Sequence, residues 1–461
     1  MQRTKVAAIV SVGVFVASLD LFIVNIAFPD IERDFHGTSL ASLSWILNAY
    51  AIVFASLLVP AGRWADRAGR KRAFLAGMAL FTASSAACAI APSVGFLIAA
   101  RVTQAAGAAL LFPTSLGLLL PEFPADERAA AIGVWAAVGG VAAAAGPPLG
   151  GVLVEASWRL VFLVNVPIGI VAIVAGIRVL REIREPDTAR GDVLGAVLLT
   201  GAVGSLTLGI VKASDWGWGS TRVVGLFLAS AVLAVLVAAR STRHPAPVIE
   251  PAVVRVRAFT VSAIAMLLFN VAFAAMLLSN VLLLTQGWHE SILRAGLQLA
   301  PGPAAAALSA VPASLLAQRI GPRWTGLLGT LLFAGGVGLL ALNAGETPHY
   351  ATAFMPGIIV GGIGVGFVLP STQGAAMSTL PPALFSTGTA KISMARQIGA
   401  ALGIALLVAV IGTPEPGHVI DAFKPVWRVE VLAALGAGVA MLLVGPLRAP
   451  AAAPVPEGSP A

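Results

Sequence analysis

One acidic residue, Asp20, lies deep inside an apolar segment, the run of residues 6–28. A charge within such a segment is costly in a membrane, so an acid at that depth is a functional candidate. Arg101 lies inside a second apolar segment, residues 94–120. At 1.5 Å per residue, Asp20 is about 14 Å from Pro29 at the end of its helix, and Arg101 is about 11 Å from the start of its own. If those two ends share one membrane face, the depths match, and they allow an ion pair where the two helices face each other.

An acid in this position can take up and release a proton. Burial favours the neutral carboxyl, whereas a nearby guanidinium favours the carboxylate. A change of substrate or conformation can therefore move the balance between the two forms. We predict that Asp20 is a proton-coupling acid and that Arg101 tunes it. A permanent structural ion pair is the alternative, since perturbed acids also occur in such networks.

Amide side chains and a second arginine are candidates for a substrate cavity. Gln104 shares a helix face with Arg101 at i and i+3. For Asn25 and Asn165, hydrogen bonding between helices is the alternative. Because Asp20 is the only deep carboxylate expected, a cavity of apolar groups and amides suits neutral or amphipathic organic molecules. The candidate cavity residues are Asn25, Gln104, Asn165, Asn270, Gln373 and Arg396.

The composition shows which elements must position these groups. Of the 461 residues, 58% are hydrophobic and 11% charged, whereas a soluble domain carries about 25% charged residues. Segments of about 20 apolar residues predict membrane-spanning helices, and the first is long enough to span rather than to act as a cleaved signal peptide. The predicted spans are 6–28, 43–61, 73–91, 94–120, 128–154, 160–180, 192–211, 222–240, 258–284, 293–317, 324–343, 351–376, 390–411 and 428–447.

The basic residues set the orientation. With the N-terminus inside the cell, twenty of the 29 Lys and Arg residues fall on the inner face and seven on the outer face. This bias predicts that both termini are cytoplasmic. Basic loops between apolar runs favour lipid headgroups as partner and argue against nucleic acid. The one cysteine, Cys88, allows no intramolecular disulfide.

A weak internal repeat divides the chain. The pattern Gly107-x5-Pro113-x3-Gly117 returns as Gly364-x5-Pro370-x3-Gly374, and residues 66–69 (DRAG) return as 318–321 (QRIG). Parallel repeats of this kind are typical of transporters with a site near the membrane midplane. The predicted division is a six-helix bundle at 1–185, two inserted helices at 186–250, a second six-helix bundle at 251–448 and a disordered cytoplasmic tail at 449–461.

Six motifs occur in order along the predicted spans. They are residues 19–29 (LDLFIVNIAFP), 62–72 (GRWADRAGRKR), 101–107 (RVTQAAG), 146–151 (GPPLGG), 158–169 (WRLVFLVNVPIG) and 396–399 (RQIG). The set resembles the major facilitator superfamily, and within it the 14-helix branch of drug:proton antiporters. Residue 105 is Ala where that family usually has Gly.

The resemblance implies an all-α integral membrane protein in which two six-helix bundles and two inserted helices alternate access to a central cavity. It also implies gating roles for Asp66 and Arg70 and for the bend at Gly146 and Pro147, and it associates that bend with exporters. The expected activity is export of small organic compounds such as antibiotics from a bacterial cell, across its plasma membrane, in exchange for protons. An uncoupled or uptake-type metabolite transporter and a transporter-like sensor are the alternatives.

The sequence contains no GxxxxGK[ST] loop for ATP and no Cys/His cluster for a metal. We therefore expect a proton gradient in place of any cofactor, no metal site, no enzymatic activity and a monomer.

Overall fold

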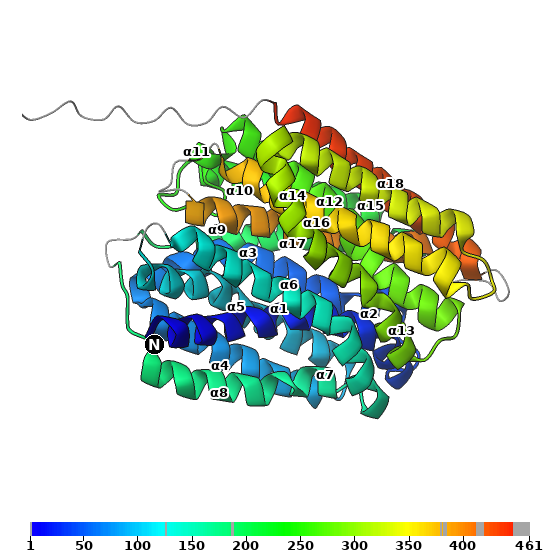
Figure 1. Cartoon of the computed structure of the whole chain (residues 1–461), viewed down its shortest axis with the longest axis horizontal. Coiled ribbons are helices and arrows are strands. Elements are labelled where there is room, and N and C mark those ends of the chain that lie inside the picture. The colour runs from blue at the N-terminus through cyan, green and yellow to red at the C-terminus, as the bar shows by residue number, and fades with distance from the viewer. Residues whose placement is uncertain are drawn as a thin grey trace, which may run out of the picture.

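The computed structural model describes residues 2–124, 127–185, 189–378, 380, 385–411 and 419–445, and its regular secondary structure over these ranges is helical. Fourteen helical segments within the described ranges are long and apolar enough to cross a membrane. They run along the long axis of the molecule (Figure 1). The predicted number of spans is thus confirmed.

Six spans form the N-terminal half. They are α1 (Gln2–Asp34), α2 with α3 (Leu40–Leu43 and Trp45–Ala68), α4 (Arg70–Ala89), α5 with η1 (Val94–Leu119 and Leu120–Glu122), α6 (Arg128–Ala156), and α7 with α8 (Leu160–Leu163 and Asn165–Val179). We call the end where α1 begins and α18 stops the terminal end, and the end where α1 stops the far end.

Six further spans form the C-terminal half, after an inserted hairpin of α9 (Val193–Trp216) and α10 (Thr221–Ser241) and a short α11 (Pro251–Val254). Figure 1 shows the C-terminal half above the N-terminal half. The spans are α12 with η2 (Arg257–Leu282 and Leu283–Gly287), α13 with α14 (Ile292–Leu299 and Pro301–Ile320), α15 (Pro322–Asn343), η3 with α16 (Tyr350–Phe354 and Met355–Met377), α17 (Phe385–Ile411) and α18 (Val419–Leu443).

The weak sequence repeat corresponds to a repeated packing arrangement. A Cβ on Gly107 of α5 would lie 2.7 Å from the backbone nitrogen of Phe81 on α4. A Cβ on Gly364 of α16 would lie 2.5 Å from the equivalent nitrogen of Phe333 on α15. Small residues let neighbouring helix backbones approach in a membrane. The same close crossing therefore occurs once in each half.

Pro147 lies within α6, and the GPPLGG motif packs that helix against two neighbours. A Cβ on Gly146 would lie 2.7 Å from Cβ of Phe22 on α1. A Cβ on Gly151 would lie 3.0 Å from Cα of Leu293 on α13. The motif thus packs on α1 within its own half and on α13 across the boundary between the halves, near the far end.

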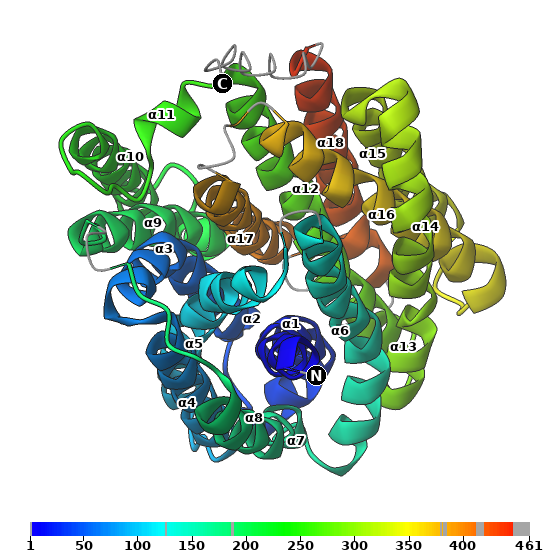
Figure 2. The same cartoon turned by 60° about the vertical axis from the view of Figure 1, so that its left-hand side comes forward.

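The inserted hairpin covers the other boundary between the halves. Figure 2 shows α9 beside α3 and α17, and α9 contacts both helices. At the terminal end, Gly191 lies against Pro60 of α3, and Lys391 Nζ of α17 lies 3.5 Å from the carboxylate of Glu250, which precedes α11. The hairpin is therefore joined to the N-terminal half where it begins and to the C-terminal half after it ends.

Several span boundaries differ from the prediction, and three of them affect the interpretation. Helix α1 continues through Pro29 to Asp34, α17 begins at Phe385, and α18 begins at Val419 rather than at residue 428. The helices extend beyond their apolar cores because charged residues at the membrane boundary are compatible with helix, so hydropathy marks only the apolar part. Lys391 therefore lies inside α17 and is buried. The predicted tail, 449–461, lies outside the described residues.

Candidate functional site

Asp20 of α1 and Arg101 of α5 form a buried ion pair in the N-terminal half. Asp20 is 0% exposed and Arg101 is 1% exposed. Arg101 Nη1 donates to Asp20 Oδ2, and Gln104 Nε2 donates to Asp20 Oδ1 over 2.9 Å. Both carboxylate oxygens are therefore satisfied, which is the condition under which an ion can remain buried. The structure thus brings together Asp20 and Arg101, the two charged residues whose depths in their helices match.

Arg101 is held by three further groups besides Asp20. Its Nε donates to the carbonyl of Ile46 on α3 over 3.1 Å, and its Nη1 lies 2.6 Å from Gln104 Oε1. Its Cζ lies 4.1 Å from the ring centroid of Tyr50. An arginine over an aromatic face gains cation–π stabilisation. Arg101 therefore connects α1, α3 and α5 in one network, so a shift of any of these helices alters the environment of Asp20.

Gln104 belongs to this network rather than to an open cavity. Its side chain is 0% exposed, and its Nε2 donates to Ser85 Oγ of α4 over 2.8 Å as well as to Asp20. Both ends of the amide are therefore occupied in this conformation. The sequence places Gln104 on the same helix face as Arg101, and for that reason it was predicted to line the cavity. The spacing of the two residues does not show what that face contacts.

Asp66 and Arg70 lie at the corner between α3 and α4, at the terminal end. Arg70 Nε donates to Asp66 Oδ1 over 2.8 Å, and its Nη1 donates to the carbonyl of Gly117 on α5 over 3.1 Å. Its Nη2 donates to Glu185 Oε1 over 2.7 Å. The partners that the structure describes for this pair thus all lie in the N-terminal half.

Two glutamates after α8, Glu182 and Glu185, complete the same corner. Glu182 accepts from the backbone N–H groups of Lys71 and Arg72 over 3.0 and 3.3 Å, at the start of α4. A carboxylate suits that position because the first N–H groups of a helix have no partner within it. Between the two helices, Gly69 adopts a φ of +116°. Sequence reasoning missed both glutamates, because in an arginine-rich loop they look like ordinary solvated charges.

The candidate cavity amides lie in different environments. Asn25 and Asn270 are buried and donate to carbonyls of their own helices, Leu21 and Met266. Asn165, at the start of α8, is 1% exposed, and neither its Nδ2 nor its Oδ1 has a hydrogen-bond partner among the described residues. Gln373 is exposed on α16. Of these four side chains, Asn165 is therefore the one that is buried without a hydrogen-bond partner among the described residues.

Arg396 of α17 is half-buried. It makes no ion pair with a carboxylate in the described part of the chain, unlike Arg101 and Lys391. Gly399, one turn further along α17, packs against α12 with its Cβ position 3.1 Å from Asn270 Cβ. A half-buried guanidinium without a protein carboxylate has donors available for a polar ligand group.

The expectation that Asp20 is the only deep carboxylate is wrong. Glu430 of α18 is 1% exposed, and its Oε1 lies 2.7 Å from Ser279 Oγ of α12. The error follows from placing the start of the last span at residue 428, which put Glu430 at a helix end. Helical periodicity could have predicted the burial of Glu430. Its position lies on the same helix stripe as the buried residues Phe423, Trp427 and Ala434.

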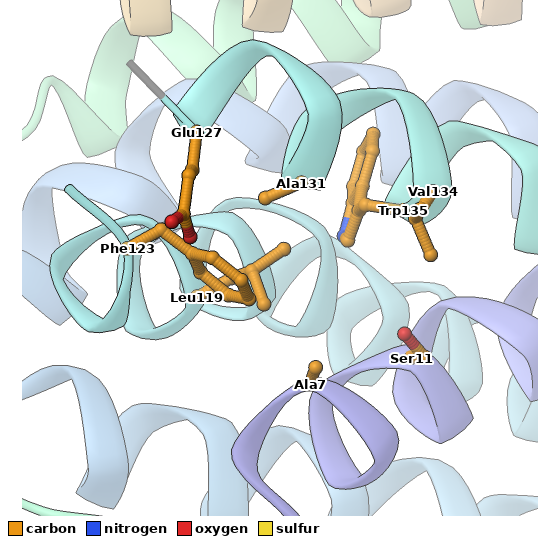
Figure 3. Close-up of a pocket in the computed structure, with 8 residues that line it drawn as sticks. All are labelled: Ala7, Ser11, Leu119, Phe123, Glu127, Ala131, Val134 and Trp135. Atoms are coloured by element: carbon orange, nitrogen blue, oxygen red, sulfur yellow. The ribbon is translucent and has the colours of Figure 1, made fainter. Parts of the chain in front are cut away.

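A small cavity of about 230 Å³ opens at the terminal end between α1, α5 and α6. Figure 3 shows Trp135 and Glu127 of its wall on one side and Ala7 and Ser11 of α1 on the other. Trp135 Nε1 donates to Ser115 Oγ over 3.0 Å, which fixes the indole ring against α5. The lining is mostly apolar, and it lies in the same half as the Asp20 network.

Comparison with known proteins agrees with this architecture. The model of the Major Facilitator Superfamily matches residues 10–247 and 258–461. A tetracenomycin C resistance and export protein of Streptomyces glaucescens is 34% identical over 93% of this chain and 78% of its own length. A methylenomycin A resistance protein of Streptomyces coelicolor is 32% identical over 88% of this chain and 85% of its own length.

Solved structures agree on the fold. A bacterial homologue of the human lysosomal transporter Spinster, in an inward-facing and unoccupied conformation, superposes with a TM-score of 0.67 at 17% identity, over 96% of each chain. The nucleoside transporter NupG superposes with a TM-score of 0.64 at 12% identity, over 97% of this chain and 100% of its own. The chain, a multi-pass membrane protein, belongs to the Major Facilitator Superfamily and is related to its antibiotic and multidrug resistance exporters.

Proposed function

We propose that this protein is a proton-coupled antiporter that exports small organic compounds from a bacterial cell across the plasma membrane. The observation that carries the proposal is the buried network of Asp20, Arg101 and Gln104. Intramembrane acids paired in this way occur in proton pathways of transporters. The names of the resistance proteins to which the chain is similar point to antibiotics as the first substrates to test.

In this proposal the terminal end faces the cytoplasm, in accordance with the excess of basic residues assigned to it. A proton from outside binds Asp20, and the neutral carboxyl no longer attracts Arg101 as an ion. The network that joins α1, α3 and α5 then relaxes, and the halves move to the alternative arrangement. Release of the proton to the cytoplasm restores the ion pair, and the compound leaves in the opposite direction.

Gating in the proposal involves the corner at Asp66 and Arg70 and the α6 motif at Gly146 and Pro147. The corner joins α3, α4 and α5 with the chain after α8, so the N-terminal half can move as one unit. The α6 motif contacts α13 at the far end, where the halves must separate for outward release. Arg396 is the side chain we propose for contact with a polar group of the substrate.

The test is proton movement in everted membrane vesicles. The vesicle lumen is acidified, tetracenomycin C or methylenomycin A is added, and dissipation of the pH gradient is recorded for wild type and Asp20→Asn. The proposal requires dissipation by wild type and its loss in the variant, at matched amounts of protein. The control is Asp30→Asn, which makes the same change of acid to amide on the same helix, where the carboxylate pairs with Arg33 and lies outside the Asp20 network.

Other outcomes contradict defined parts of the proposal. Dissipation that survives in Asp20→Asn places the coupling site elsewhere. Compound flux without proton movement supports an uncoupled transporter. Compound binding without any flux supports a sensor.

A further inference from the structure

Glu430 is an acid, buried within a span, that the proposed cycle does not use. Besides Ser279, the structure gives it no hydrogen-bond partner within the described residues. It lies between α18 and α12, in the half opposite Asp20. An ionised carboxylate buried without a cation is strongly disfavoured in a membrane protein, so the way in which this side chain is satisfied needs an account.

The charged residues on the packed elements do not supply a counter-ion. The elements α12, η2, α15 and α17 contact α18, and within the described ranges none of their charged residues forms an ion pair with Glu430. On α18 itself, Lys424 pairs with Asp421. Besides Glu430 and the pair of Asp421 and Lys424, the charged residues on α18 and on these elements are Arg257, Arg323, Lys391, Arg396 and Arg428.

The hydrogen-bond geometry favours a neutral carboxyl. Ser279 Oγ lies 2.7 Å from Glu430 Oε1 and 3.2 Å from the carbonyl oxygen of Met276. A hydroxyl has one hydrogen, so it cannot donate to a carboxylate and to a carbonyl together. If Glu430 is protonated, its O–H donates to Ser279 Oγ, and Ser279 donates to Met276. The Met276 carbonyl already accepts the N–H of Asn280 within α12, so the carboxylate form leaves no backbone acceptor unpaired. The protonated form is favoured because it adds a donor to Ser279 and removes a buried charge that is met by one neutral hydroxyl.

The position of Glu430 couples it to the boundary between the halves. Ser279 is on α12, which contacts α1 across that boundary, where the rings of Phe22 and Phe273 meet. Glu430 is about 17 Å from the start of α18 and Asp20 is about 21 Å from the end of α1. The two acids thus lie at similar distances from the far end, Asp20 on α1 and Glu430 on α18 behind the facing helix α12.

We propose that Glu430 is a second proton-binding site, which holds its proton in the conformation described here and exchanges it when α12 moves with the halves. The proposal rests on the proposed antiport, but it assigns a distinct group in the other half. Each half then carries one such acid. The first is held as an ion by Arg101, and the second is held neutral by Ser279.

The first test needs no substrate. Infrared spectra of the purified protein in lipid nanodiscs are recorded over a pH series for wild type, Glu430→Gln and Asp20→Asn. The protonated carboxyl gives a C=O band that amides and carboxylates do not. We expect a band that Glu430→Gln lacks, that Asp20→Asn keeps and that wild type loses as the pH rises. Gln can keep a hydrogen bond to Ser279, and Glu430→Asp provides a second variant should Gln disturb folding.

The second test counts protons. In vesicles, Glu430→Gln should move fewer protons per molecule of exported tetracenomycin C than wild type, by about one, the number that a carboxyl binds. The proposal is overturned if wild type lacks the infrared band. It is also overturned if the band persists at every pH and Glu430→Gln moves as many protons per exported molecule as wild type. If wild type moves no protons, the proposed antiport fails, and the pH series still decides whether Glu430 binds a proton.

Discussion

Removing Arg101 should destabilise the protein far more than removing Arg101 and the charge of Asp20 together. In Arg101→Met, Asp20 must either remain ionised with only Gln104 as donor or take up a proton, and both are costly at neutral pH. Breaking a buried ion pair by deleting one partner costs about 3–5 kcal/mol. In Asp20→Asn, Arg101 keeps Ile46, Gln104 and the face of Tyr50, so the loss is that of one charged hydrogen bond, about 1.5–3 kcal/mol.

The double variant Asp20→Asn with Arg101→Met carries no charge at this site. Its cost is therefore expected to be below that of Arg101→Met alone, which makes the interaction energy of the two positions strongly non-additive. Purified variants are heated in detergent at one fixed scan rate, and unfolding is followed by tryptophan fluorescence, since such unfolding is governed by rate as well as by equilibrium. The expected order of midpoints is wild type first, then Asp20→Asn and the double variant, with Arg101→Met lowest. A double variant less stable than Arg101→Met would refute the reasoning.

Three further predictions follow from the packing and the polar groups. Gly364→Ala should lower the stability by about 1–3 kcal/mol through overpacking, because its Cβ would meet the backbone of α15. Gly374→Ala on the same helix is the control, since its Cβ meets nothing within 4 Å. The thermal midpoints of the two variants are compared, and equal midpoints would count against the close crossing. Asp66→Ala should lower the rate of compound export more than compound binding, because it loosens Arg70 at the corner without altering a cavity; binding and flux measured on one preparation check this, and a normal rate would contradict it. Asn165→Leu should leave the thermal midpoint unchanged or raise it, since it removes two buried polar atoms that have no partner among the described residues. A lower midpoint would mean that Asn165 makes a hydrogen bond that this conformation does not show.

Hydropathy was enough to predict the spans, because a bilayer demands long apolar helices whatever their partners. The matching depths of Asp20 and Arg101 were also predictable, because the rise per residue converts sequence position into depth. Their contact was no more than allowed by depth, since depth does not show that α1 and α5 face each other there. Glu430 was missed because a depth argument depends on where the helix starts, and the charged residues at 421, 424 and 428 hid the first turns of α18.

The contacts that Glu182 and Glu185 make with the start of α4 depend on tertiary structure, which no local sequence pattern predicts. Each glutamate is far in sequence from the groups that it binds on α4. The division of roles between Gln104 and the other amides was likewise beyond sequence, because a helix face does not reveal its neighbour. Residue type and spacing predicted which groups were polar and deep, and the fold determined which of them meet.

The inserted hairpin has a mechanical consequence. A chain that passed directly from one bundle to the next would be a flexible connection. Here Gly191 contacts α3, Glu250 is held by Lys391 of α17, and α9 packs against both helices. The two bundles and the hairpin therefore form a closed linkage at the terminal end, with α9 packed along the line where α3 and α17 contact each other. Separation of the bundles at that end must part α3 from α17 and shift at least one of them against α9, so in the proposed cycle the hairpin limits how far the two bundles can move apart.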